Sequence, residues 1–225
     1  VCTDHECSTW EQAEERLETG MTVQVREGSA ARNLEAIVKG AVASGVGLGR
    51  CVFCTDDLHL EDVRRQGHID HNIRKAVGLG ADPIEAIAAA TIQAAELYGL
   101  QEIGAIAPGY RADLVVLDDL KTVKICGGYK NGVAWEELLK RENPPTPAEN
   151  AVKQSVHIPE ISREQLGIPA EKEFPVIAVI PGEIVTRKEI LDLPGKNGWF
   201  LPEGDLLKLV AVQRHDGSGR TGVGV

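Results

Sequence analysis

Two clusters of polar residues in the first part of the chain have the residue types and spacing to do chemistry. Glu6 follows His5 directly, and Asp56, Asp57 and His59 follow a short apolar run. Histidine and aspartate are frequent ligands of catalytic metal ions, and carboxylates also transfer protons. Neither cluster is decisive alone, because a single His in a polar turn is often a surface residue, and an Asp after a strand often caps the next helix.

The segments around these clusters follow a repeating strand–helix pattern. Residues 51–54 form a short apolar run typical of a buried strand, and residues 21–25 alternate as a second strand does. The residues before His5 are interpreted as a further strand, and Ser8 and Glu11 have capping-box spacing for the helix that follows. The carboxyl ends of barrel strands open at one face, so a parallel barrel predicts that both clusters meet there.

The second and third strands are each followed by residues with helical spacing. Ser29 is predicted to cap the helix that includes Leu34, although an alternative is that Glu27 or Ser29 faces a substrate. Asp70 and Arg74 are placed to form an ion pair one helical turn apart.

A longer helix is predicted to begin at Asp82 and Pro83. It is expected to continue as one helix to Tyr98, with Gly99 and Leu100 forming a Schellman stop.

The strand–helix alternation ends at Gly104. Strand-like residues 114–117 and 123–126, with a tight turn at Gly127-Gly128, predict a small β unit. The clearest linker is Asn143-Pro-Pro-Thr-Pro147. Beyond it, three segments are predicted as strands: 176–180, 183–185 and 206–212.

Composition excludes several classes of protein. The net charge of −10 and the pI near 5.1 argue against nucleic-acid binding, and no run of 18 apolar residues predicts a membrane span. Five cysteines, an odd number, suit reduced thiols in the cytoplasm rather than a disulfide framework. Because Val1 is not an initiator Met and the last residues form no recognisable element, we expect a piece of a longer protein.

Three other motifs suggest different functions, and the sequence supports each of them less well. Cys51 and Cys54 have zinc-ribbon spacing, but residues three apart on a strand point to opposite faces. The cytidine-deaminase signature is not met, because His5 and Glu6 are adjacent and Arg50 stands where Pro is required. The glycine pattern at 217–222 is interpreted as a loop or hairpin connection.

Six segments of the chain are similar to segments of one known family, and they occur in the same order as in that family. Together they resemble the bacterial adenine deaminases of the amidohydrolase superfamily. The segment that begins at Gly104 is shared by many members of the superfamily, whereas the segments that begin at Arg26 and Phe53 are more particular to the adenine enzymes. The segments are Thr3-Asp-His-Glu6, Arg26-Glu-Gly-Ser-Ala-Ala-Arg-Asn-Leu34, Phe53-Cys-Thr-Asp-Asp57, Gly67-His-Ile-Asp70, Gly104-Ala-Ile-Ala-Pro-Gly-Tyr-Arg-Ala-Asp-Leu-Val-Val-Leu-Asp-Asp119 and Arg214-His-Asp-Gly-Ser-Gly219.

The resemblance implies an α/β fold made of the last strands and helices of a TIM-like (β/α)8 barrel. A small β-sandwich and part of a C-terminal α+β domain are expected to follow. The implied boundaries are 1–103 for the barrel part, 104–142 for the sandwich segment, 143–154 for the linker and 155–225 for the start of the C-terminal domain.

The resemblance also implies the site residues. His5 corresponds to a metal ligand, and Asp56 to the final aspartate, which binds metal and moves the proton of the attacking water. Glu6 is a second candidate catalytic residue, while Asp57 and His59 match family positions without an assigned role. The ligands of the first, fourth and fifth barrel strands do not occur in this chain, so we expect it to be inactive alone.

The implied reaction is the hydrolysis of adenine to hypoxanthine and ammonia in purine salvage, in a cytoplasmic enzyme that is a homo-oligomer when full length. The implied cofactor is one or two divalent metal ions, manganese or iron, with zinc as an alternative. Two other readings stay open: an amidohydrolase acting on a cyclic amide or imide, and a non-catalytic binding or assembly module in which the carboxylates only cap helices.

Overall fold

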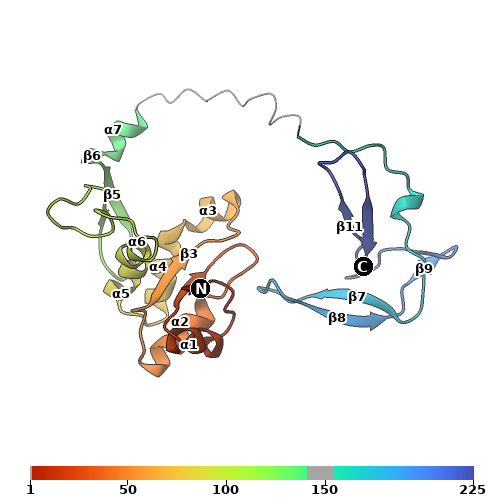
Figure 1. Ribbon diagram of the computed structural model, residues 1–225, viewed down its shortest axis with the longest axis horizontal. Helices are drawn as coiled ribbons and strands as arrows, with labels where there is room; N and C mark the ends of the chain where they lie inside the picture. The colour runs from red at the N-terminus through yellow and green to blue at the C-terminus, as the bar shows by residue number, and fades with distance from the viewer. Residues whose placement is uncertain (1, 141–154) are drawn as a thin grey trace. The chain divides into compact units, whose positions relative to one another are not determined.

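The computed structural model describes residues 2–140 and 155–225 (Figure 1). The chain divides into two compact units, Val1–Glu142 with Pro181–Ile184 and Asn143–Ile180 with Val185–Val225. The predicted linker, 143–154, lies outside the described residues, and the predicted division into four segments stays a prediction.

A three-stranded parallel sheet organises the first unit. Its strands are β1 (Thr3–Asp4), β2 (Thr22–Arg26) and β3 (Cys51–Cys54), with β2 in the middle. Both pairings are parallel, and Arg26 lies opposite Cys54 at the end of the β2–β3 register. The three predicted strands are therefore present, and each is followed by a helix.

Helices pack on this sheet and supply its core (Figure 1). Val23 and Val25 of β2 are fully buried with Ile37 and Val38 of the helix that follows. Alternate residues of a strand face opposite sides, so these valines form the apolar face of β2. The helices are α1 (Trp10–Glu18), α2 (Leu34–Ser44), α3 (Leu60–Gln66), α4 (Ile69–Gly78), α5 (Pro83–Ala90) and α6 (Ile92–Leu97).

The capping box predicted at Ser8 and Glu11 is wrong by one residue. Thr9 caps α1, and its hydroxyl accepts a 3.4 Å hydrogen bond from the Gln12 amide. The Gln12 side chain in turn accepts a 2.8 Å bond from the amide of Ser8. Adjacent hydroxyl residues compete for one cap, and the choice depends on which backbone amides face them.

The single helix predicted after Asp82 is also wrong, since it breaks at Thr91. Thr91 has φ −131° and ψ −95°, and its hydroxyl donates a 2.7 Å bond to the carbonyl four residues earlier. Such back-bonding disturbs a helix. Both ends are as predicted: Asp82 caps α5, and Leu100 N–H donates to the Ala95 carbonyl beyond Gly99, whose φ is +64°.

The first unit ends in a small antiparallel sheet. Its strands are β4 (Leu114–Leu117), β5 (Ile125–Lys130) and β6 (Val133–Ala134), followed by α7 (Trp135–Leu139). The turn predicted at Gly127-Gly128 is wrong, because both glycines lie within β5. The chain turns instead at Asn131 and Gly132, whose φ values of +51° and +76° are those of a type I′ hairpin.

In its described residues, the second unit consists of three antiparallel strand pairs, a short helical turn and a small apolar core. The predicted strand at 183–185 is wrong, since these residues lie between β7 and β8, and the strand predicted from 206 begins at Leu209. Residues 217–220 of the glycine pattern lie in the hairpin connection between β11 and β12, as predicted, whereas Thr221 and Gly222 already belong to β12. The elements are η1 (Glu164–Leu166), β7 (Phe174–Val179), β8 (Thr186–Leu191), β9 (Gly195–Lys196), β10 (Trp199–Phe200), β11 (Leu209–Val212) and β12 (Thr221–Gly224).

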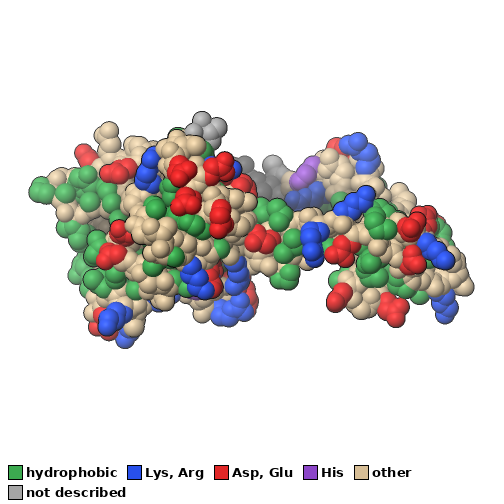
Figure 2. Space-filling view, turned by 90° about the horizontal axis from the view of Figure 1, so that it is seen from below, with side chains coloured by type: hydrophobic (Ala, Val, Ile, Leu, Met, Phe, Trp, Pro, Cys, Tyr) green, Lys and Arg blue, Asp and Glu red, His purple; other side chains and the backbone are tan. Residues whose placement is uncertain are grey.

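The visible surface carries mixed charge. Figure 2 shows acidic and basic side chains interspersed on one face of the molecule. Within the described parts of the chain, none of the helices has the length and apolar character needed to cross a membrane.

Candidate active site

The carboxyl ends of the three parallel strands meet at one edge of the sheet. His5 follows β1, Glu27 follows β2 and Asp56 lies two residues after β3. Because β2 separates the outer strands, the ends of β1 and β3 are two strand spacings apart, about 10 Å. No hydrogen bond or ion pair among the described residues joins His5 to Asp56, and their common role stays a prediction.

Glu6 links the histidine to a buried arginine. Arg26, only 1% exposed, donates from Nη1 to Glu6 Oε2 over 2.7 Å and from Nη2 to Asn33 Oδ1 over 3.0 Å. The other Glu6 oxygen, Oε1, lies 3.2 Å from His5 Nε2. A carboxylate fixed by a guanidinium on one side can orient an imidazole on the other. Arg26, Glu6 and His5 therefore form a continuous series of polar contacts at the ends of β1 and β2.

Asp56 is exposed, and its backbone has an unusual conformation. Its φ is +48°, in the left-handed region that favours glycine. No hydrogen bond or ion pair to its carboxylate is present within the described residues. The suggestion that it caps the next helix is wrong, because His59 occupies the N-cap of α3.

Asp57 does not cap α3 either. Its Oδ1 accepts a 3.2 Å bond from Ser29 N–H and its Oδ2 a 2.7 Å bond from Ala30 N–H. Gly28 is needed beside it, since a Cβ built there would lie 1.8 Å from Asp57 Oδ1 and 2.9 Å from the Thr55 carbonyl oxygen. Asp57 thus joins the loop after β3 to the loop after β2.

Ser29 adds a second connection between these loops, so its predicted role as the α2 cap is wrong. Its hydroxyl donates to Asp62 Oδ2 over 2.6 Å and accepts from His59 N–H over 2.9 Å. The Ser29 hydrogen bond holds the pKa of Asp62 below its ordinary value. α2 itself begins after Asn33, which makes no side-chain cap bond.

Glu27 is buried and forms an ion pair with α4. Its side chain is 4% exposed, and Oε1 lies 2.7 Å from Lys75 Nζ. His71 Nε2 is 4.0 Å away, but burial lowers the pKa of His71, which favours its uncharged form. The expectation that Glu27 faces a substrate gains no support from these contacts, which tie it to Lys75.

Three buried polar atoms lie at the ends of β2 and β3 without a hydrogen-bond partner in the described part of the chain. They are Arg26 Nε, Glu27 Oε2 and Asn72 Oδ1, the last on a side chain whose Nδ2 donates to the Cys54 carbonyl. Such atoms are rare in folded proteins and call for an explanation. All three lie beside the edge of the sheet at which Glu27 follows β2 and Asp56 follows β3.

The cysteines do not form a zinc cluster. Cys51 is buried and Cys54 partly buried on β3, and burial raises their pKa values to about 12 and about 11. All five cysteines are free thiols. Among residues 2–140 and 155–225, no group of three or more His, Cys, Asp or Glu side chains is arranged to hold a metal.

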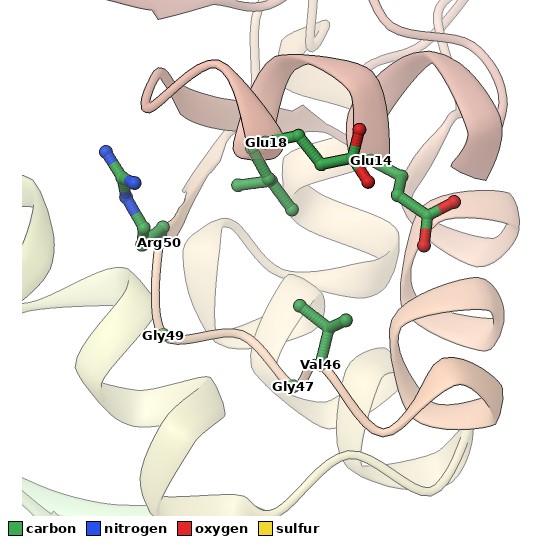
Figure 3. Close-up of a pocket in the computed structure, with 7 residues that line it drawn as sticks. Glu14, Glu18, Val46, Gly47, Gly49 and Arg50 are labelled. Carbon is green, nitrogen blue, oxygen red and sulfur yellow. The ribbon is translucent and has the colours of Figure 1, made fainter.

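A separate cavity of about 320 Å³ lies at the opposite end of the strands (Figure 3). Glu14 and Glu18 on α1 face the loop from Val46 to Arg50, which leads into the amino end of β3. This cavity is therefore distinct from the edge that carries His5 and Asp56.

Comparison with known proteins places the chain in a family. A profile described as "Amidohydrolase family" matches residues 8–153. The chain belongs to the amidohydrolase family. Members of this superfamily generally depend on divalent metal ions.

Curated relatives of the chain include proteins named adenine deaminase. The chain is 40% identical to that of Desulfitobacterium hafniense (strain Y51), over 99% of this chain and 39% of the relative. It is 38% identical to that of Lysinibacillus sphaericus (strain C3-41), over 100% of this chain and 39% of the relative. The chain thus spans about two fifths of the length of these relatives.

Similar solved structures include an enamidase described as a member of the amidohydrolase superfamily, with a TM-score of 0.47 and 21% identity over 59% of this chain and 40% of that one. A β-aspartyl dipeptidase from Fervidobacterium islandicum AW-1 has a TM-score of 0.46 and 21% identity, over 59% of this chain and 38% of that one.

Sequence reasoning missed Arg26 and the role of Asp57. The available signal for Arg26 was its position at the end of a strand in which Val23 and Val25 alternate with polar residues. A charged residue at such a strand end can lie at a functional site. For Asp57 the signal was weaker, because its partners Ser29 and Ala30 are 28 and 27 residues away.

Proposed function

We propose that this chain is a C-terminal part of a divalent-metal-dependent adenine deaminase, including the last strands and helices of its barrel, and that the whole enzyme hydrolyses adenine to hypoxanthine and ammonia. The observation that carries the proposal is the common edge at which His5 and Asp56 follow two strands of one parallel sheet. The names of the relatives, which match almost the whole chain, support adenine as the substrate.

The residues present fit part of a metal site. An imidazole and a carboxylate are suitable ligands for manganese, iron or zinc, and the buried polar atoms nearby lack partners among the described residues. When bound, the metal lowers the pKa of water and so supplies a strong nucleophile at neutral pH. His5 and Asp56 would hold it together with ligands from the part of the relatives that this chain does not span. We therefore expect the 225-residue chain alone to be inactive.

Asp56 is the proposed proton carrier. Its exposed carboxylate, which has no partner among the described residues, accepts a proton from the attacking water and passes it to the leaving amino nitrogen. The carbon–nitrogen bond to the amino group breaks as the carbon–oxygen bond forms, which balances adenine and water against hypoxanthine and ammonia. Glu6, fixed by Arg26, orients His5.

The test is a chimaera in which this chain replaces the matching segment of the Desulfitobacterium hafniense relative; we call it the grafted enzyme. Loaded with manganese or iron, it is expected to release ammonia from adenine and not to hydrolyse the ring of cyclic amides or imides, which is followed by the appearance of the ring-opened acid. Asp56→Asn is expected to lower the rate by about 10²–10⁴-fold, the usual range for a lost acid–base group. Asp118→Asn, an exposed aspartate in the loop between β4 and β5, is the matched control.

Two results would contradict the proposal. Turnover of cyclic amides but not adenine would favour the other amidohydrolase reading. Equal adenine turnover in the Asp56→Asn and Asp118→Asn variants would remove Asp56 from the reaction and favour a non-catalytic role for the strand-end carboxylates.

A further inference from the structure

The backbone of Asp56 needs support from its surroundings. A φ of +48° is unfavourable for a residue with a side chain, and such a conformation persists only where neighbouring contacts enforce it. Since Asp56 makes no side-chain bond within the described residues, the enforcing contacts lie on either side of it along the chain.

On the N-terminal side, the end of β3 is fixed by two bonds to one carbonyl. The Cys54 carbonyl accepts from Glu27 N–H over 3.1 Å and from Asn72 Nδ2 over 3.1 Å. One donor belongs to the residue after β2 and the other to α4. The chain therefore enters Thr55 in a fixed direction.

On the C-terminal side, Asp57 and His59 are fixed by the loop after β2. Asp57 accepts the Ser29 and Ala30 amides, and His59 N–H donates to the Ser29 hydroxyl over 2.9 Å. Gly28 leaves room for the Asp57 carboxylate, which a Cβ there would overlap. Every one of these contacts connects the β2 loop to the β3 loop.

We propose that Asp57 and Ser29 are positioning residues, which hold Asp56 in its left-handed conformation and so fix the direction of its carboxylate at the strand ends. We call the contacts of Asp57 and Ser29 with the two loops the loop clamp. The clamp as a structural device rests on the geometry alone. Its importance for the reaction rests on the proposed function.

Asp57→Asn tests the clamp with little change of shape. An amide presents an N–H group where a carboxylate oxygen accepts, so it cannot receive both backbone donors. The matched control is Asp119→Asn in the loop between β4 and β5, because Asp119 likewise accepts two backbone amides, Lys121 and Thr122, each over 2.7 Å.

The first measurement uses NMR on the 225-residue chain. A positive φ gives Asp56 a strong intraresidue contact between its amide and α protons. In Asp57→Asn this signal is expected to weaken, and the Ser29 and Ala30 amides are expected to exchange about tenfold faster. Asp119→Asn is expected to change neither. If the two amides exchange faster while the Asp56 signal is unchanged, the clamp does not hold Asp56 and the proposal is wrong.

The second measurement uses the grafted enzyme. Asp57→Asn is expected to lower kcat by about 10²-fold with little change of KM, because misplacing a catalytic group acts on the reaction rather than on binding. A purely structural defect would instead change the thermal midpoint and the active fraction, both of which are measured alongside.

Gly28→Ala disturbs the clamp from the β2 loop, because its Cβ would overlap the Asp57 carboxylate. It is expected to reproduce the Asp57→Asn result. Its control is Gly49→Ala, where an added Cβ meets nothing within 4 Å. A kcat in both clamp variants within twofold of their controls would overturn the positioning role. An unsubstituted grafted enzyme that fails to deaminate adenine would overturn the proposed function instead, and the NMR result would still decide whether the clamp holds Asp56.

Discussion

Replacing Lys75 with Met is expected to destabilise the first unit strongly. Glu27 Oε1 accepts from Lys75 Nζ over 2.7 Å, and the two side chains are 4% and 25% exposed. Glu27 Oε2 already lacks a partner among the described residues, and burial lowers the pKa of the neighbouring His71, which disfavours the charged imidazole. Lys75→Met therefore leaves the buried Glu27 carboxylate without a cationic partner.

The magnitude follows from this burial. Removing one partner of a buried ion pair costs about 3–5 kcal/mol, and the partial exposure of Lys75 places the expected loss near the lower end, about 3 kcal/mol. With urea m-values of about 1–3 kcal/mol per molar, the unfolding midpoint falls by about 1–3 M.

The assay is urea unfolding at pH 7, followed by circular dichroism at the helix band. All α-helices in the described residues belong to the first unit, so this signal reports on that unit. Lys39→Met is the control, because Lys39 and Glu35 also approach to 2.6 Å but are both more than half exposed, and an exposed helical pair contributes only about 0.3–0.5 kcal/mol.

A double variant separates the charge from the packing. Glu27→Gln combined with Lys75→Met removes both charges, so it is expected to be more stable than Lys75→Met alone. A Lys75→Met midpoint equal to that of Lys39→Met would refute the reasoning, since it would mean that the Glu27 carboxylate needs no cationic partner.

Two further predictions concern thiols and acid. Because burial raises the pKa of Cys51 to about 12, thiol reagents at pH 8 are expected to label the exposed Cys2 and Cys126 first and Cys51 only after unfolding, as mass spectrometry of labelled peptides checks. Burial alone would raise the pKa of Asp70, but the bonds from His68 N–H and Arg74 outweigh it and hold the pKa below 3.8. Asp70 thus contributes stability above that pH and loses it as the pH falls through the lowered pKa, so the stability advantage over Asp70→Asn is expected to vanish in acid unfolding curves at low pH.

Local patterns in the sequence predicted much of the first unit. The Asp82 cap and the Asp70–Arg74 pair, which is 2.8 Å long, involve residues within one helical turn. The strand at 51–54 was predictable because its apolar run is short and bounded by polar residues. Such features depend on nearby residues alone, so the sequence contains all the information they need.

The failed predictions depended on contacts that the sequence does not display. The helix after Asp82 breaks because the Thr91 hydroxyl bonds to its own helix, an outcome that propensity does not distinguish from a continuous helix. Ser29 and Asp57 are both good cap residues, and their actual partnership arises only when parallel strands bring two loops together. The direction of the Arg26 side chain likewise depends on tertiary contacts with Glu6.

The central claim is that His5 and Asp56 bind the same metal ion. The most direct test is the metal affinity of the grafted enzyme, measured by competition with a chelating dye for the unsubstituted protein, His5→Ala, Asp56→Asn and the double variant. We predict that each single variant binds metal at least tenfold more weakly, and that the double variant loses less than the sum of the two losses, because both side chains serve one site. Unchanged affinity in either single variant, or fully additive losses, would contradict the claim.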